Sequence, residues 1–309
     1  MNLQQLEYIV AIDTHRHFVT AAEACHIAQA TLSMMVKKLE EELGTKIFDR
    51  SRQPVVPTDI GQKLIAQARI VLQESQRMRQ IVSEAEGQLS GELRIGIIPT
   101  VAPYLLHRFL HSFRTKYQAV RLHVAETNTE AIVKGLEQQH LDVGILALPL
   151  ASPGIVERML FADEFVLYAA PGDILMQKKY VLPADIDPER LWLLEEGHCL
   201  RAQVLNFCTL KIKDKPSRQG IDDSLLHQPL DFAAGSIETL KNIVDANGGI
   251  TILPSMALAT LSTSQRAQVR HFASHAPHRT IGLATYRYLV KAKLVDALAQ
   301  EILTAIAPT

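Results

Sequence analysis

The sequence has few cysteines, a single tryptophan and no long apolar run. Three cysteines in 309 residues, an odd and sparse number, do not make the disulfide framework of a small secreted domain. No uninterrupted apolar run approaches the roughly 18 residues that span a bilayer. The first ten residues, MNLQQLEYIV, lack the basic patch and apolar core of a signal peptide. We therefore expect a cytoplasmic protein whose cysteines are small apolar residues, redox groups or metal ligands.

Net charge is also nearly absent, so no overall basic field announces a nucleic-acid partner. The formal net charge is −1, and residues 1–58 carry six Lys/Arg against seven Asp/Glu. Any attraction for a polyanion must then depend on where the charges lie rather than on their sum. The composition, 47% hydrophobic and 21% charged, is that of an ordinary globular protein. The length predicts two domains, or one domain with an appendage.

Residues 1–58 have the pattern of three helices followed by a pair of strands. Apolar residues at helical spacing predict the first and third helices. Between them, Thr20-Ala-Ala-Glu23 fits a capping box, so we expect the short second helix to begin there. Two short helices joined by a tight turn, behind a first helix, are typical of a helix-turn-helix, and the strand pair predicts a wing. The expected elements are helices over 3–14, from Thr20 and up to Gly44, strands over 47–50 and 55–57, and a cap at Thr58 for the next helix.

Residues 58–89 are the most clearly periodic segment. Their apolar positions alternate by four and three, a heptad seam over about three and a half repeats. At 1.5 Å per residue, a helix here is roughly 45 Å long. A lone helix of that length with one apolar stripe needs a partner, and a second copy of the chain is the simplest. The seam consists of Leu64, Ala68, Val71, Ser75, Met78, Val82, Ala85 and Leu89.

After Ser90 and Gly91, strands alternate with helices. This alternation predicts a mainly parallel α/β sheet with covered faces, and about 219 residues are enough for two α/β lobes. We expect the chain to cross between the lobes near 161–164 and 268–273. The expected strands are 93–98, 121–126, 143–147, 165–169, 191–194, 250–253 and 281–286, and the expected helices are 103–116, 130–139, 199–209, 236–246 and 291–306.

Four motifs in the first 58 residues carry a family resemblance. They are Phe18–Glu23 (FVTAAE), Ala28–Ser33 (AQATLS), Lys38–Glu40 (KLE) and Leu43–Arg50 (LGTKIFDR). Together they resemble the signature of LysR-type transcription regulators. The resemblance implies an α/β protein with a winged helix-turn-helix, a dimerising linker helix and a two-lobed regulatory domain like the periplasmic binding proteins. It also implies promoter DNA and RNA polymerase as partners, and dimers that pair into tetramers. The implied boundaries are 1–58, 59–89 and 90–309, with lobe I at about 91–162 and 272–309 and lobe II at about 163–271.

The third helix supplies the residues expected to read DNA. Its first turns enter a major groove and reach base edges, while basic residues further along and in the wing suit phosphates. Glu40, Glu41 and Glu42 fall at the far end of the helix, where acids need not touch DNA. A merely solvated polar face is the alternative interpretation. Ala28 stands where the family commonly has serine, which removes a capping oxygen worth ~1 kcal/mol. The residues expected to contact DNA are Gln29, Thr31, Ser33, Lys37, Lys38, Arg50 and Arg52.

A second set of motifs surrounds two cysteines. Glu196–Arg201 (EGHCLR) and Asn206–Cys208, together with 96–106 and 279–283, resemble the peroxide-sensing members of the LysR family over nearly the whole chain. The resemblance implies a non-enzymatic activator of oxidative-stress genes without a metal or cofactor. Its signal is hydrogen peroxide, which oxidises one cysteine that a second cysteine then resolves as a disulfide. The implied redox pair is Cys199 and Cys208, and the implied peroxide pocket is Thr100, Thr129, His198, Arg201 and Arg279.

The chemistry needs a thiolate, because a thiol attacks peroxide poorly and a free cysteine is mostly protonated at neutral pH. Cys199 is expected just past a strand, at a helix N-terminus with Arg201 one turn along, and both features favour the anion. If residues 199–208 form a helix, nine steps of 1.5 Å separate the two Cα atoms by roughly 13 Å. A disulfide tolerates at most ~7 Å, so this helix would have to unwind.

Other interpretations of these residues stay open. Two cysteines nine positions apart in an apolar stretch are commonly core residues. The chain would then be a LysR-type regulator that responds to a small acid bound between the lobes. A thiol peroxidase or a solute-binding transport protein has no use for the DNA-binding head, and the Cys199, Cys208 and His198 spacing matches no usual zinc pattern. Cys25 is expected to be a small buried residue, and the charged segment 211–231 a loop.

Overall fold

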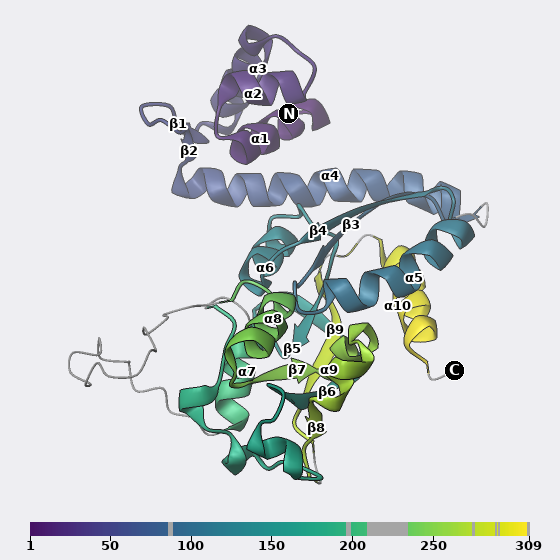
Figure 1. The fold of residues 1–309 in the computed structure, drawn as a ribbon. Helices are drawn as coiled ribbons and strands as arrows, with labels where there is room; N and C mark the ends of the chain where they lie inside the picture. The colour runs from purple at the N-terminus through teal and green to yellow at the C-terminus, as the bar shows by residue number, and fades with distance from the viewer. Residues whose placement is uncertain are drawn as a thin grey trace, which may run out of the picture. The chain divides into compact units, whose positions relative to one another are not determined.

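The computed structural model describes residues 1–85, 89–195, 199–208, 234–273, 276–287, 289 and 291–307. The chain divides into two compact units, one of residues 1–91 with 288–292 and one of residues 92–287 with 293–309 (Figure 1). Among the described helices, none has both the length and the apolar character that a membrane crossing requires. Each unit has its own buried core and is described separately below.

The first unit is a three-helix head with a strand pair and one long helix. Leu32, Val36 and Leu39 of the third helix are fully buried against Ile9 and Ile12 of the first. The third helix ends at Gly44, whose left-handed backbone (φ +65°) suits glycine. These features confirm the predicted helices and wing. The elements are α1 (Leu3–His15), α2 (Phe18–Ala24), α3 (Gln29–Leu43), β1 (Phe48–Asp49), β2 (Val56–Pro57) and α4 (Asp59–Ala85).

The capping box predicted at Thr20 is wrong. Helix α2 begins two residues earlier, at Phe18, with His17 as an N-cap whose side chain makes no capping hydrogen bond. The Phe18 ring lies 6.4 Å from the Phe48 ring in an edge-on arrangement, so the first residue of α2 packs against the start of the wing. The two other capping expectations are confirmed. Ala28 caps α3 without a side-chain hydrogen bond, and the Gly61 amide donates to the Thr58 hydroxyl at 3.0 Å.

The first part of the predicted heptad seam of α4 packs against the core of the same chain. Ala68 is buried, and Leu64 packs beside it against the core of the head. On the same helix, Arg69 donates to the buried carboxylate of Asp13 in α1 at 2.6 Å. Further along, Val71 and Met78 are exposed, 37% and 71%, respectively. Val71 and Met78 of the seam therefore remain an exposed apolar surface of this single chain.

The second unit is a two-lobed α/β domain built on one seven-stranded sheet. Its main path is β4-β3-β5-β9-β6-β7, and β8 pairs with β6. The strands are β3 (Gly91–Ile97), β4 (Val120–Glu126), β5 (Val143–Leu148), β6 (Ile155–Ala169), β7 (Ile250–Pro254), β8 (Val269–His271) and β9 (His278–Tyr286). The helices are α5 (Ala102–Lys116), α6 (Thr129–Glu137), α7 (Cys199–Phe207), α8 (Ile237–Asn247), α9 (Thr263–Ala267) and α10 (Ala292–Ile306), with short 3-10 helices at 174–177, 183–185, 188–190 and 255–260.

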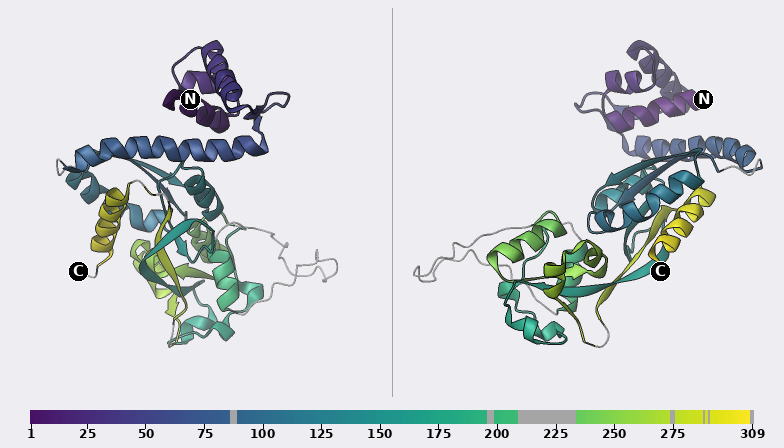
Figure 2. Two further views of the ribbon diagram at one scale, coloured as in Figure 1. Left: turned by 180° about the vertical axis from the view of Figure 1, so that it is seen from behind. Right: turned by 45° about the vertical axis from the view of Figure 1, so that its right-hand side comes forward.

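The expectation of a mainly parallel sheet is wrong. Strand β3 pairs with β5 in parallel, but β9 runs antiparallel to both β5 and β6, and β6 is antiparallel to β7 and β8. The long strand β6 pairs with β9 over 155–164 and with β7 over 165–169 (Figure 2). One strand thus has antiparallel neighbours in both halves of the seven-stranded sheet. The strand predicted over 191–194 is also wrong, because only Leu191 and Leu194 form isolated bridges there.

Candidate functional site

The first turns of α3 present the residues expected to reach bases. Gln29 and Thr31 are exposed, and Ser33 is partly exposed. The N-cap residue of α3, Ala28, makes no side-chain hydrogen bond to the first amides of the helix. This end of the helix therefore presents polar side chains, and their contact with bases stays a prediction.

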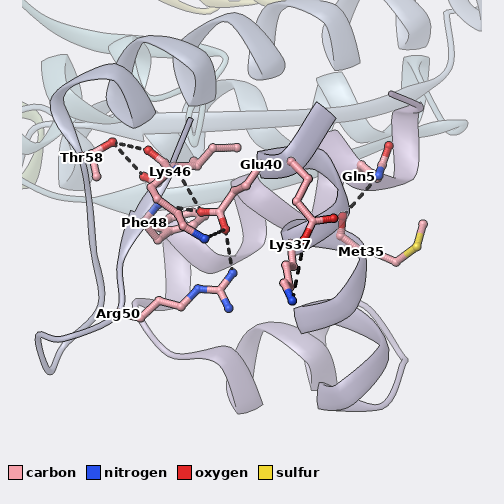
Figure 3. A network of polar contacts seen from close by, with 10 residues as sticks. Gln5, Met35, Lys37, Glu40, Lys46, Phe48, Arg50 and Thr58 are labelled. Carbon is pink, nitrogen blue, oxygen red and sulfur yellow. Dashed lines mark hydrogen bonds and ion pairs between the residues drawn. The ribbon is translucent and has the colours of Figure 1, made fainter. Parts of the chain in front are cut away.

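The wing is held to α3 by a buried carboxylate, Glu40 (Figure 3). Glu40 is 2% exposed, and its Oε1 accepts from the Ile47 and Phe48 amides at 2.9 and 3.3 Å. Its Oε2 accepts from Arg50 Nη2 at 3.0 Å, with Lys46 Nζ at 3.7 Å. From the sequence, Glu40 was expected only to lie at the far end of the helix, away from DNA. Its spacing of four from the buried Val36 was the signal that placed it on the core side.

Three of the four basic residues expected to bind phosphate are already paired. Arg50 donates to Glu40 and lies over the Phe18 ring, 5.1 Å from its centroid. Lys37 pairs with Glu41 at 3.7 Å and Arg52 with Asp49 at 3.3 Å, and the lysine and arginine are well exposed.

The carboxylate of that second pair is also held by hydrogen bonds. The hydroxyl and amide of Ser51 lower the pKa of Asp49, with a smaller contribution from Arg52. Of the four basic residues, only Lys38 has no ionic partner within the described part of the chain. Because exposed pairs are weak, a phosphate can compete for Lys37 and Arg52, whereas Arg50 is held in the fold.

The two cysteines of the second motif lie at the two ends of α7. Cys199 is the first residue of the helix and is partly exposed, whereas Cys208 follows the last residue and is only 4% exposed. The Cys208 amide donates to the Val204 carbonyl at 3.1 Å, so helical bonding continues to that residue. Neither sulfur is in a disulfide. The predicted helix is confirmed, and nine steps of it separate the Cα atoms by roughly 13 Å.

Burial raises the pKa of the Cys208 thiol from an ordinary 9.0 to about 11. The buried position therefore disfavours the thiolate, and a state in which Cys208 is exposed gains by ionising. The stability that this burial adds to α7 is complete below pH 9 and is lost as the pH rises toward 11.

We expect iodoacetamide to alkylate Cys208 of the reduced protein slowly up to pH 9 and steeply faster toward pH 11. Peptide mass spectrometry after timed alkylation measures the rate. Urea-unfolded protein is the control, and its Cys208 should react with a midpoint near pH 9. Identical pH profiles for native and unfolded protein would show that the buried position does not protect the thiol.

The residues expected to form a peroxide pocket are only partly brought together. Arg201 Nη1 donates to the Leu194 carbonyl at 2.9 Å, so this guanidinium anchors α7 to the segment that precedes it. The Thr129 hydroxyl, at the start of α6, is buried and has no hydrogen-bond partner among the described residues. His198 lies outside the described residues, as does the segment 211–231.

Arg279 and Thr100 are in direct contact. Arg279 is fully buried, and its Nη1 donates to Thr100 Oγ1 at 2.8 Å and its Nη2 to the Thr100 carbonyl at 3.0 Å. Its Nε and Nη2 also donate to Asp163 Oδ2 at 3.0 and 2.9 Å. Asp163 in turn accepts from the Ser255 hydroxyl and the Met256 amide. Sequence reasoning missed Asp163, whose only signal was an acid inside an apolar strand.

A second polar contact nearby was also missed. The buried Tyr104 of α5 donates to Glu238 Oε1 of α8 at 2.9 Å, and Glu238 pairs with the buried Lys241 at 2.6 Å. Burial, followed by the charge of Glu238, raises the pKa of Tyr104, which therefore stays a neutral donor. Within the described residues, no three His, Cys, Asp or Glu side chains are grouped so that they could hold a metal ion.

Comparisons with known proteins agree with this geometry. Residues 3–62 match the family of bacterial regulatory helix-turn-helix proteins, lysR family, and residues 86–307 match the LysR substrate binding domain. The DNA-binding transcriptional dual regulator OxyR of Escherichia coli K12 is 37% identical over 92% of this chain and 88% of its own length. Its identity spans the head and the regulatory domain alike.

Two solved structures give the same result. A full-length OxyR of Pseudomonas aeruginosa, with aspartate in place of a cysteine, is 30% identical with a TM-score of 0.78 over 98% of both chains. A Corynebacterium glutamicum OxyR cysteine-to-serine mutant, with hydrogen peroxide bound, is 27% identical with a TM-score of 0.61 over 98% of this chain and 92% of that one. The chain therefore belongs to the LysR family of DNA-binding transcription regulators, among the relatives of OxyR.

Proposed function

We propose that this regulator senses hydrogen peroxide by oxidation of Cys199 and formation of a disulfide with Cys208. The observation that supports this most strongly is the placement of the two thiols. One is accessible at the N-terminus of α7, and the other is buried at its far end. Two inert core cysteines would both be buried. The Corynebacterium glutamicum OxyR structure with hydrogen peroxide bound supports the same signal.

The chemistry has two steps. The Cys199 thiolate attacks one peroxide oxygen, the O–O bond breaks, and the leaving hydroxide takes a proton to form water. Cys208 then attacks the sulfur of the resulting sulfenic acid. The S–S bond forms, the S–O bond breaks, and a second water leaves. Two thiols lose two electrons in all, and one peroxide becomes two water molecules.

The pocket for peroxide is proposed from Thr100, Thr129, His198, Arg201 and Arg279. The unpartnered hydroxyl of Thr129 is able to bond a small polar ligand without first breaking a contact. Arg279 acts through Thr100, since it donates to that hydroxyl and leaves the hydroxyl proton to point elsewhere. Arg201 acts by holding the start of α7 in place.

The output is a changed contact with promoter DNA. Closing the disulfide requires α7 to unwind, and local unfolding of this kind is an established way to shift an oligomer between two arrangements. We propose that the exposed Val71 and Met78 of α4 pack against a second copy, that dimers pair into tetramers, and that the DNA-bound oligomer contacts RNA polymerase. The proposed domain boundaries remain 1–58, 59–89 and 90–309.

A regulator that binds a small acid between the lobes, with inert cysteines, is the competing proposal. Such a site needs a cationic group with free donors. The buried Arg279 makes four hydrogen bonds to Asp163 and Thr100, out of the five that a guanidinium can donate. Because the guanidinium of Arg279 is already bonded to Asp163 and Thr100, it has little left to bind an acid, and this favours the redox proposal.

Thiol trapping with mass spectrometry tests the redox proposal. We expect substoichiometric peroxide to convert reduced protein into a form with residues 199 and 208 linked and Cys25 still alkylatable. Replacing Cys199 with serine should abolish both the link and the change in promoter binding, because no sulfenic acid forms. Cys25→Ser is the matched control and should respond normally. If both thiols stay alkylatable after oxidant, or if C199S still responds to peroxide, the proposal is wrong.

A further inference from the structure

Three aromatic rings meet at the C-terminal end of α7. The Phe207 ring stacks on Phe165 of β6, with centroids 5.8 Å apart and an interplanar angle of 16°. Its edge contact with Phe272, just past β8, has centroids 5.3 Å apart and an angle of 87°. Phe165 and Phe272 are 2% and 5% exposed, so the two outer rings are fixed in the core. The Phe207 ring thus lies between two buried aromatic rings.

Phe207 is the immediate neighbour of Cys208. To close a disulfide, the Cα atoms of Cys199 and Cys208 must approach from roughly 13 Å to at most ~7 Å. The start of α7 is tied to the preceding segment by the hydrogen bond from Arg201 to the Leu194 carbonyl, which favours movement at the Cys208 end. Because neighbouring Cα atoms are only ~3.8 Å apart, a shift of about 6 Å at Cys208 displaces Phe207 from between Phe165 and Phe272 as well.

The described residues that flank this region are held together. Leu194, before α7, and Ala234, after it, pair in a parallel bridge. The Glu195 amide donates to the Ala234 carbonyl at 3.0 Å, and both Leu194 and Ala234 are buried. Among the described residues, α7 is then held by the buried Leu200, Val204 and Cys208, by the hydrogen bond of Arg201 and by the ring contacts of Phe207.

We propose that Phe207 is the positioning residue that sets the redox poise of the Cys199–Cys208 pair, because its ring stabilises the helical, reduced form. This inference rests on the proposed function. The poise is the equilibrium in which two glutathione molecules reduce the protein disulfide, giving two protein thiols and one oxidised glutathione. Weakening the ring contacts destabilises the thiol side and so favours the disulfide.

Replacing Phe207 with leucine tests the proposal. We expect Phe207→Leu to shift this equilibrium toward the disulfide by about tenfold, a midpoint potential about 30 mV more negative. Titration of the full chain in glutathione buffers, with thiol trapping at each point, measures it. Amide hydrogen exchange of the reduced protein should rise by about tenfold over α7. Phe207→Tyr keeps the ring at this partly exposed position, so its midpoint potential and its hydrogen exchange over α7 should both equal those of the wild type.

Phe113→Leu is the matched control. Phe113 is fully buried in α5, with its ring centroid 4.8 Å from that of Tyr117, so its loss weakens the fold at another helix than α7. We expect F113L to leave the potential unchanged. If wild-type protein forms no 199–208 disulfide, the proposed function fails and the redox role of Phe207 fails with it. If wild type forms the bond but F207L and wild type share one potential, only the inference about Phe207 is overturned.

Discussion

Replacing Arg279 with leucine is expected to lower the free energy of unfolding of the regulatory unit by about 3–5 kcal/mol. Arg279 and Asp163 are both fully buried and joined through Nε and Nη2 to one carboxylate oxygen. Removing the guanidinium leaves a buried carboxylate whose charge no cation offsets, which costs more than the ion pair itself contributes. Urea unfolding of the purified chain, followed by circular dichroism, measures the change.

An exposed pair in the same unit provides the control. Arg158 and Asp296 also contact each other at 2.6 Å, but their side chains are 47% and 67% exposed. Arg158→Leu should therefore cost less than about 1 kcal/mol. The double variant Asp163→Asn with Arg279→Leu should recover part of the loss, because it removes the unpaired charge. If R279L and R158L unfold at the same urea concentration, the buried pair contributes no more to stability than the exposed pair.

Replacing Arg279 with lysine separates two roles for this residue. Its contact with Thr100 Oγ1 positions a hydroxyl that we propose for peroxide binding. Lysine at position 279 keeps the charge but cannot reproduce the forked contacts to Asp163 and Thr100. A stable R279K protein with slowed oxidation of Cys199 would assign Arg279 to positioning, whereas normal oxidation would restrict it to stability.

The order of elements could be predicted from the sequence because hydrophobic periodicity is a local signal. The predicted helices that became α3, α5, α7 and α10 agree with the structure within one or two residues at most of their ends. Strand direction is not local. Nothing in residues 155–169 indicates that the first half pairs with β9 and the second with β7, since both pairings are made across more than 80 residues.

The candidate site was predictable where resemblance or a local motif carried it, and not where burial decided. The helix predicted over 199–209 placed Cys199 at its start and Cys208 near its end, and the structure has α7 there. Asp163 could not be found, because an acid next to another acid, Glu164, on a strand is typical of an exposed face. The role of Glu40 was missed for a related reason, since the run of three glutamates masked the helical spacing that buries the first of them.

Glu40→Ala is expected to have the largest effect on DNA binding. Its loss leaves the buried Ile47 and Phe48 amides without an acceptor, at roughly 1–3 kcal/mol each, and releases Arg50 from its ion pair. The wing begins at those two amides. We therefore expect affinity for duplex DNA, selected from a random pool with wild-type protein, to fall by at least about tenfold, ~1.4 kcal/mol. Fluorescence anisotropy at fixed salt measures the change.

Two neighbouring variants make this prediction specific. Glu40→Gln keeps an oxygen for the amides but lacks the charge that Arg50 and Lys46 face, so its affinity should fall between wild type and E40A. Glu41→Ala removes the next glutamate, which is 64% exposed and pairs only with Lys37 at 3.7 Å among the described residues. Because E41A frees Lys37 for a phosphate, its affinity should be unchanged or slightly higher. Equal losses in E40A and E41A would mean that net charge, rather than the position of the wing, controls binding by this nearly neutral head.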